Sequence, residues 1–254
     1  MLLTAQSLSK RYGDVVAVDG VSFELDRGET LALIGASGCG KTTTLKLLNR
    51  LIEPDTGEVR LAGDGAHAVD AHEWRRRIGY VVQSAGLFPH WSVARNIAAT
   101  CALLEWDEGR TQAQVGRLMD MIGLPAADYA ERKPAELSGG QRQRVGLARA
   151  LAAEPDLILM DEPFSAVDAL TKESLITDVS RLRSEIGFAA VIVTHDFAEA
   201  LAFADRIAVM DAGKIVQIGT ADELVRSPSD PAVEALIDAP RRTAARVADA
   251  LGAG

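Results

Sequence analysis

The chain has 254 residues, 48% of them hydrophobic, and carries a formal charge of −9 at pH 7. This length and apolar content suffice for one large domain or two small ones. The acidic balance, with no basic run longer than Arg75-Arg76-Arg77, argues against a protein that binds the nucleic-acid backbone, because such proteins normally present a basic face. We therefore expect no nucleic-acid partner.

The sequence also carries no sign of export or membrane insertion. The first residues form too short an apolar run for a signal peptide, and no stretch approaches the roughly 18 uninterrupted apolar residues of a membrane span. The two cysteines, Cys39 and Cys101, suggest no disulfide framework. We expect a soluble, cytosolic chain. If it serves a membrane process, another polypeptide supplies the membrane part.

Hydrophobic patterns predict strands that alternate with helices. Residues 18–25 alternate apolar and polar side chains, 30–34 are nearly continuously apolar, and 41–51 have the apolar spacing of a helix. Such alternation of strands and helices indicates an α/β fold with a mainly parallel sheet covered on both faces. Further elements are predicted as strands at 78–82, 157–160, 190–193 and 207–210, a helix at 171–186, a hairpin turn at 211–214 and a helix after Pro231.

Residues 86–151 differ from the rest, because they are rich in helical patterns and contain no convincing strand. We interpret them as a helical subdomain inserted into the α/β core. We divide the chain into one domain over 1–230, which includes this insertion, and a short C-terminal helical tail over 231–254 without a regulatory domain.

Residues 35–42 fit the phosphate-loop pattern G-x-x-x-x-G-K-[ST] at every fixed position. Glycines let backbone N–H groups point at an anion, and the helix that follows adds its positive end. Lys41 would reach the β- and γ-phosphates, and the Thr42 hydroxyl would ligate Mg²⁺. The alternative, a glycine-rich turn before an ordinary helix, is disfavoured because the whole pattern lies between a strand and a helix. We assign nucleotide contacts to Gly35, Ala36, Ser37, Gly38, Cys39, Gly40, Lys41, Thr42 and Thr43.

Two carboxylates, Asp161 and Glu162, close the apolar strand at 157–160. Adjacent acids after a strand more often begin a loop, but the phosphate loop upstream favours a catalytic pair. Asp161 would hold Mg²⁺, directly or through water, and Glu162 would orient or deprotonate the attacking water.

The run Leu137-Ser138-Gly139-Gly140-Gln141 stands just before a predicted helix over 142–152. A serine and two glycines at a helix start offer a hydroxyl, free N–H groups and a helix dipole, which together form a second anion site. In isolation the run could simply cap the helix. Because the phosphate loop already supplies one cradle, a second cradle needs a different phosphate to hold.

In this order, the phosphate loop, the Leu-Ser-Gly-Gly-Gln run and the two acids resemble the ATP-hydrolysing subunit of ABC transporters, and the resemblance covers nearly the whole chain. It implies a P-loop NTPase core with a mainly parallel sheet, an antiparallel β subdomain and an inserted helical subdomain. It also implies an ATPase with ATP and Mg²⁺ as cofactors.

The resemblance implies roles for three further residues. Tyr12 would stack on adenine, with an ordinary surface tyrosine as the alternative. Gln83 would bind metal or the lytic water. His195, at the carboxyl end of a strand, would contact the γ-phosphate, with a structural histidine as the alternative. Gln83, Glu162 and His195 form the predicted catalytic set, and Thr42, Gln83 and Asp161 the predicted metal ligands.

The resemblance further implies a dimer. In the family this signature run reaches the γ-phosphate on the opposite subunit, so that ATP lies between two head-to-tail domains. Ser165-Ala166-Val167-Asp168, where the family usually has Leu at the third position, would communicate across the interface, and we count Asp168 among the nucleotide-binding residues. The partner would be a second copy or a related ATPase chain.

Two kinds of ABC ATPase compete as interpretations. One is the energy-coupling subunit of an importer, docked on transmembrane permease subunits and linked through them to a substrate-binding protein. The other is a soluble ATPase of DNA repair or translation, which typically carries a long coiled-coil insertion or tandem ATPase domains, neither of which this sequence has. We therefore expect an importer subunit, peripheral on the cytoplasmic face of the cell membrane.

The runs 47–54 and 86–90 resemble the ATPases of osmoprotectant importers, which take up glycine betaine, choline or carnitine. Importers of amino acids or other small solutes share parts of these runs and stay as the alternative. Many members of the osmoprotectant group also carry a C-terminal pair of regulatory domains, for which we expect no room here.

Two local hypotheses complete the predictions. The loop Gln83–Trp91 is unusually apolar and would dock on a permease, unless it packs inside the helical subdomain. Cys39 lies near a helix start and Lys41, both of which favour a thiolate, so it would be a reactive thiol that reports nucleotide occupancy. The alternative is an inert residue tucked under the loop. Cys101 is expected to be buried.

Overall fold

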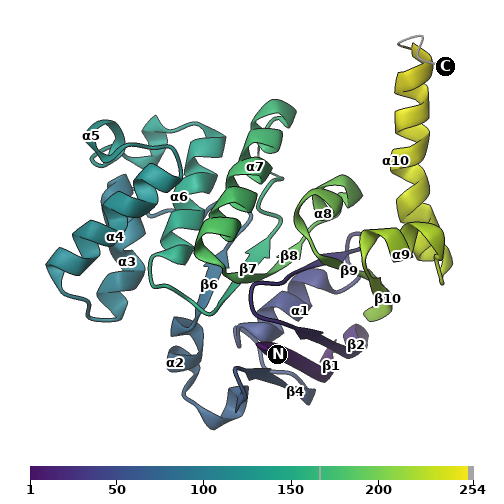
Figure 1. The fold of residues 1–254 in the computed structure, drawn as a ribbon. Helices are drawn as coiled ribbons and strands as arrows, with labels where there is room; N and C mark the ends of the chain where they lie inside the picture. The colour runs from purple at the N-terminus through teal and green to yellow at the C-terminus, as the bar shows by residue number, and fades with distance from the viewer. Residues whose placement is uncertain (166, 251–254) are drawn as a thin grey trace.

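The computed structural model describes residues 1–165 and 167–250, which form two sheets with helices packed around them (Figure 1). Among these residues the larger sheet has six strands in the order β10-β9-β3-β8-β7-β6. The strands from β9 to β6 run parallel, and β10 pairs antiparallel with β9, so the predicted mainly parallel sheet is confirmed. The strands are β3 (Thr30–Ile34), β6 (Ile78–Val81), β7 (Leu157–Asp161), β8 (Ala189–Val193), β9 (Arg206–Asp211) and β10 (Lys214–Gly219).

The smaller sheet is antiparallel and has the strand order β2-β1-β4-β5. The predicted strand at 18–25 is part of its longest member. The sequence patterns did not predict β1 or β4. In β1 the alternation of buried residues is broken at Ser7, which has φ +49° and lies where the register with both neighbouring strands shifts. The strands are β1 (Leu3–Tyr12), β2 (Val15–Leu25), β4 (Thr56–Leu61) and β5 (Asp64–Gly65).

Helices occupy the segments between the strands, and residues 86–151 contain helices but no strand, as the pattern predicts. The treatment of that segment as a subdomain stays a prediction. The helices are α1 (Lys41–Leu48), α2 (Ala71–Arg76), α3 (Val93–Leu103), α4 (Glu108–Met121), α5 (Ala126–Tyr129), α6 (Gly139–Leu151), α7 (Ala169–Ile186), α8 (Phe197–Phe203), α9 (Ala221–Arg226) and α10 (Pro231–Ala250), with short 3₁₀ turns η1 (Ala66–Ala68) and η2 (Pro134–Glu136).

Alternate residues of the central strands pack on opposite faces of the larger sheet. In β7, Ile158 and Met160 join a core cluster with residues of α6, α7 and α8, whereas Leu157 and Leu159 join a second cluster with α1 and the smaller sheet. Every residue of β3 and β8 is buried, which is typical of strands in a parallel sheet covered on both faces. The larger sheet is therefore the middle layer of the fold.

The predicted helix at 41–51 is too long by three residues, because α1 ends at Leu48. Arg50 adopts a left-handed conformation with φ +49°, its N–H donates to the Leu47 carbonyl, and the Leu51 N–H donates to the Lys46 carbonyl. These two bonds form a Schellman motif, which satisfies the last carbonyls of a helix and ends it.

The C-terminal part of the chain follows the predicted pattern. Asp211 of β9 pairs with Lys214 of β10, so the predicted hairpin turn is confirmed. The helix predicted after Pro231 is α10, which extends away from the sheets in Figure 1. Over the described residues, no helix combines the length and the apolar character that a membrane crossing requires.

Trp74 of α2 supports the C-terminal end of α1. Its side chain is fully buried, and its indole Nε1 donates to the Leu48 carbonyl oxygen at 2.9 Å. In Trp74→Phe that buried carbonyl loses its donor and the smaller ring leaves a gap. We expect the free energy of unfolding, measured by urea denaturation, to fall by about 2–4 kcal/mol. Trp106→Phe is the control, because Trp106 is partly exposed. An equal loss of unfolding free energy in both variants would contradict the conclusion that Trp74 supports the end of α1.

Candidate functional site

The predicted phosphate-loop and catalytic residues gather at one edge of the larger sheet. The strands β3, β8, β7 and β6 are neighbours and parallel, so their carboxyl ends meet there. The phosphate loop follows β3, Glu162 follows β7, His195 follows β8 and Gln83 follows β6. Ligands of open α/β sheets bind in the crevice outside these strand ends. A cavity of about 550 Å³ opens at this edge, lined by Ala17, Ser37, Gly38, Gly40, Lys41, Thr42, Thr43, Gln83, Glu162 and His195.

Close backbone contacts require two glycines of the phosphate loop. Gly35 has φ +152°, and a Cβ there would lie 2.1 Å from the Met210 carbonyl oxygen. Gly40 has φ +108°, and a Cβ there would lie 2.3 Å from the Ala17 carbonyl oxygen. Only glycine tolerates both this conformation and this proximity. The loop is therefore held tightly between β9 and β2.

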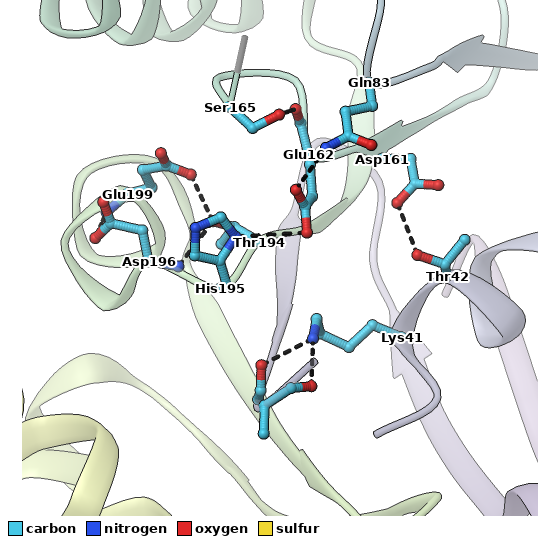
Figure 2. A network of polar contacts seen from close by, with 12 residues as sticks. Lys41, Thr42, Gln83, Asp161, Glu162, Ser165, Thr194, His195, Asp196 and Glu199 are labelled. Carbon is cyan, nitrogen blue, oxygen red and sulfur yellow. Dashed lines mark hydrogen bonds and ion pairs between the residues drawn. The ribbon is translucent and has the colours of Figure 1, made fainter. Parts of the chain in front are cut away.

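The start of α1 offers a cradle for an anion. Gly40 is its N-cap and has no side chain to satisfy the first N–H groups, which stay available to a ligand. Lys41 is 6% exposed, and its Nζ donates to the carbonyl oxygens of Gly35 at 2.8 Å and Ala36 at 2.9 Å (Figure 2). Backbone N–H groups and one ammonium thus converge on the cavity, as a polyphosphate requires.

Thr42 and Asp161 bring two hard oxygen ligands together. The Thr42 hydroxyl donates to Asp161 Oδ1 at 3.0 Å, although the two residues are 119 positions apart (Figure 2). Burial raises the pKa of the Asp161 carboxyl above its usual value; the Thr42 hydrogen bond opposes this shift and the Glu162 charge adds to it. Mg²⁺ fits this pair, because it prefers oxygen ligands, keeps several waters and commonly takes its remaining ligands from phosphates. Its charge would also offset the cost of burying the carboxylate.

The remaining ligands of such an ion would have to come from outside the protein. No cluster of three or more His, Cys, Asp or Glu side chains that could hold a metal occurs in 1–165 or 167–250. Gln83 donates from Nε2 to Glu162, whereas a metal ion would be bound by its amide oxygen. Its predicted role as a metal ligand stays a prediction.

Glu162 stands between an amide and an imidazole. Its Oε2 accepts from Gln83 Nε2 at 3.0 Å, and its Oε1 lies 3.4 Å from His195 Nδ1 (Figure 2). Its backbone has φ +46°, a left-handed conformation that costs a non-glycine residue about 1–2 kcal/mol. Three hydrogen bonds hold it there: the Glu162 N–H donates to Val193, and its carbonyl accepts from the N–H and hydroxyl of Ser165. The carboxylate is therefore held in place beside the phosphate loop, where it can accept hydrogen bonds.

Helix α6 holds the loop that carries Gln83. Gln143, which is almost fully buried, donates from Nε2 to the Gln83 carbonyl at 2.6 Å. Arg149 donates to the carbonyls of Ala85 at 2.8 Å and Gly86 at 2.7 Å. The sequence analysis missed Gln143 and Arg149. A usable signal was that Gln143 and Arg149 lie three residues before and three residues after Gly146, because glycine inside a helix often marks a close backbone contact.

The signature run lies outside the phosphate-loop cavity of its own chain. Ser138 is the N-cap of α6: its hydroxyl accepts from Gln141 N at 3.2 Å, and Gln141 Oε1 accepts from Ser138 N at 2.9 Å. This capping box shows that the run does cap the helix. Whether it also binds a phosphate on another chain stays a prediction. Gly139 and Gly140 form the first turn of α6.

Asp168 lies at the start of α7 and not in the cavity. It is the N-cap of that helix and accepts from Thr171 N at 3.1 Å and Thr171 Oγ1 at 2.7 Å. Ala166, which belongs to the predicted interface run, lies outside the described residues. The structure therefore does not bring Asp168 to the phosphate loop within one chain, and its predicted nucleotide contact would need a partner chain.

Tyr12 and the two cysteines have distinct environments. Tyr12, the last residue of β1, is 50% exposed and does not line the cavity.

Cys39 is only 5% exposed, so the structure favours a residue tucked under the loop over an accessible reactive thiol. The backbone contacts of the loop enclose its Sγ, which lies 3.7 Å from Lys41 Nζ. Cys101 is fully buried as predicted, and burial raises the pKa of its thiol.

The apolar loop after Gln83 lies on the surface. Phe88 is 45% exposed and stacks against Trp91, with 4.3 Å between ring centroids. Arg95 and Arg149 lie near these rings, and Asn96 accepts from the Phe88 N–H at 2.8 Å. The exposure of Phe88 favours a surface patch over packing inside the helical segment. The docking role itself stays a prediction.

Comparison with known proteins agrees with this geometry. The family model described as ABC transporter matches residues 18–165. The choline transport ATP-binding protein OpuBA of Bacillus subtilis (strain 168) is 46% identical over 93% of this chain and 62% of its own length. The glycine betaine uptake system ATP-binding protein YehX of Escherichia coli (strain K12) is 45% identical over 88% of this chain and 72% of its own length. The chain thus spans about three fifths of the length of the first of these relatives.

A solved structure agrees as well. It is described as the dimeric, post-hydrolysis state of an ATP-binding cassette bound to ADP and Pi, and it matches with a TM-score of 0.76 and 29% identity, over 86% of this chain and 98% of that one. The segment matched by the family model contains the phosphate loop, the signature run and both strand-end acids. From these motifs, their geometry and the extent of the matches, we conclude that the chain belongs to the ABC transporter family.

Proposed function

We propose that this chain is the ATP-hydrolysing, energy-coupling subunit of an ABC importer. The observation that carries the proposal is the Glu162 carboxylate, held between Gln83 and His195 at the mouth of a phosphate cradle. A carboxylate in this position can orient a water molecule and accept its proton, while the cradle binds the phosphates that the water attacks.

Each part of the cavity has a role in this reaction. The loop amides and Lys41 would bind the β- and γ-phosphates, and Thr42 and Asp161 would hold Mg²⁺, which would neutralise phosphate charge. Gln83 donates to one oxygen of Glu162, and His195, which lies beside the other oxygen, would donate to the γ-phosphate. The chemistry thus depends on positioning and charge more than on any covalent step.

We further propose that ATP is bound between two chains. The signature run forms the N-terminus of a 13-residue helix but lies outside the phosphate cavity of its own chain. A second chain, either a copy or a related ATPase, would bring that helix end to the γ-phosphate. In the same arrangement Asp168 would approach the nucleotide across the interface, and the exposed ring of Tyr12 would stack on adenine. The similar solved cassette, which is dimeric, supports this arrangement.

For the transported solute we propose osmoprotectants or quaternary amines. The names of the two relatives, choline transport and glycine betaine uptake, support this class at 46% and 45% identity. An importer for another small solute is the alternative. Transmembrane permease subunits and, through them, a substrate-binding protein complete the proposed assembly. The chain would be peripheral on the cytoplasmic face of the membrane and would bind no nucleic acid.

Glu162→Gln tests the catalytic assignment. Glutamine keeps the size and hydrogen bonding of the side chain but removes the proton acceptor. We expect ATP hydrolysis to fall at least about 100-fold while Mg-ATP still binds and a dimer accumulates. A hydrolysis assay beside gel filtration with Mg-ATP measures both effects. Hydrolysis at the parent rate would refute the role of Glu162.

Lys41→Ala separates binding from chemistry in the same assays. The buried ammonium is a charge partner for phosphate, so its loss is expected to weaken nucleotide affinity by about tenfold or more. No ATP-induced dimer should then form at nucleotide concentrations that suffice for Glu162→Gln. Unchanged nucleotide affinity would contradict the assignment of the cradle.

The aromatic surface patch tests coupling to a permease. Replacing both Phe88 and Trp91 with Ser removes the stacked rings but leaves the cavity untouched. We expect the ATPase activity of the isolated chain to stay within about twofold of the parent. Solute uptake by vesicles reconstituted with the complete importer should fall at least about tenfold. Ile218→Ser, at an apolar residue with 38% exposure on β10, is the control. Normal uptake by the double variant would exclude the patch from docking, and a loss of folding would favour a packing role.

A further inference from the structure

A buried carboxylate lies behind His195. Glu199, in the first turn of α8, is 4% exposed. Figure 2 shows it beside Thr194 and Asp196, the two residues that flank the histidine. Neither Glu199 nor Thr194 lines the phosphate cavity, so the proposed hydrolysis does not use them directly. Burying a carboxylate this deeply costs free energy unless an opposite charge and hydrogen bonds compensate it.

The network around Glu199 clamps the chain on both sides of His195. The Thr194 hydroxyl donates to Glu199 Oε2 and accepts from the Asp196 N–H at 3.0 Å. Asp196 in turn caps α8, where its Oδ1 accepts from Ala198 N at 2.9 Å. The His195 side chain itself is 62% exposed and lies 3.4 Å from Glu162. The neighbours of the histidine are therefore fixed while its imidazole faces the cavity.

The cation that balances this network comes from another helix. Lys172 of α7 places its Nζ 2.6 Å from Glu199 Oε1 and 3.5 Å from Asp196 Oδ2. Burial acts to lower the pKa of Lys172, but its hydrogen bonds to both carboxylates and their negative charges outweigh burial and raise it. The lysine therefore stays charged, and its removal would leave the Glu199 carboxylate buried without a counter-charge.

The same end of α7 contacts the signature helix, α6, whose first turn carries the signature run. Thr171, the residue before Lys172, lies so close to Gly140 that a Cβ on the glycine would be 2.4 Å from Thr171 Cγ2. About two turns further along, Asp178 of α7 forms an ion pair with Arg144 of α6 at 2.6 Å. Contacts thus connect the signature helix to α7, and α7 to the residues on either side of His195.

We propose that Lys172 and Glu199 form a positioning pair that sets His195 against Glu162 and links that histidine, through α7, to the position of the signature helix. The pair acts through His195, and neither of its members lines the phosphate cavity. The inference rests on the proposed ATPase function for its kinetic consequence, but the placement of the imidazole is a property of the fold and can be measured without turnover.

The test uses the full chain and charge substitutions. Lys172→Met removes the charge at similar length, and Lys172→Arg retains it. Arg226→Met is the control, because Arg226 of α9 forms an exposed ion pair with Asp222 outside the contacts that connect α6, α7 and the residues around His195. The chain has four histidines, so their ring resonances are resolvable by NMR with labelled histidine, and His195→Gln assigns the relevant one. We expect Lys172→Met to move the His195 resonance more than that of any other histidine, and Arg226→Met to leave it in place.

Kinetics give the second readout. Lys172→Met is expected to lower kcat for ATP about tenfold, with nucleotide affinity within about twofold of the parent, because the cradle is untouched. Lys172→Arg should recover most of kcat. In a His195→Gln background Lys172→Met should add no further loss, because the pair acts through that histidine.

Two results would overturn the inference: an unmoved His195 resonance in Lys172→Met, or an equal drop in kcat when His195 is already replaced. If Lys172→Met does not fold, Glu199→Gln answers the same question, since it removes the other charge and keeps a partner for Thr194. Failure of the parent chain to hydrolyse ATP would refute the proposed function alone, and the resonance would still decide the positioning role.

Discussion

The site depends first on the backbone register of four neighbouring parallel strands. Hydrogen bonding pairs β3 with β8, β8 with β7 and β7 with β6, and this order places four strand ends along one edge of the sheet. Residues as far apart in the sequence as Ser37 and His195, 158 positions, then follow those ends within a single cavity. Because the strands are parallel, their carboxyl ends lie along the same edge, and the side chains that follow these ends are already close to the cavity. A slip of one residue would turn these side chains to the opposite face.

The cost of assembling the site lies in charge and backbone strain. Asp161 and Glu162 place two carboxylates side by side, one of them half-buried, and burial raises the pKa of Asp161. Glu162 also adopts a left-handed backbone conformation. The surrounding hydrogen bonds from Thr42, Gln83 and Ser165 offset part of this cost. Such strain persists at functional sites because the neighbouring structure over-determines the conformation.

Helix α6 connects three parts of the site. Its first turn carries the signature run, its middle holds the Gln83 loop through Gln143, and its ion pair with α7 leads to Lys172 and the loop of His195. A displacement of this helix would therefore be felt at both residues that contact Glu162. The connection consists of partly buried hydrogen bonds and ion pairs, which hold their geometry better than fully exposed contacts do.

Local patterns in the sequence determined much of the fold. Continuous apolar runs predicted the strands of the larger sheet, because a strand covered on both faces has no polar side to reveal its period. The fixed positions of the phosphate loop and the strand-end acids identified the region of the site. The patterns failed where local geometry interrupts them, as in β1 at Ser7 and at the Schellman motif that ends α1.

Only the tertiary structure decided how these parts meet. Cys39 looked accessible in the sequence, but the packing of the phosphate loop against β9 and β2 encloses it. The supporting roles of Gln143, Arg149 and Lys172 were also established only by the structure, because each depends on a partner at least 24 positions away. The sequence by itself determined which chemistry the chain carries, since that chemistry resides in residue types at fixed local spacing. The tertiary structure determined which residues hold that chemistry in place, since their contacts form only when distant segments pack together.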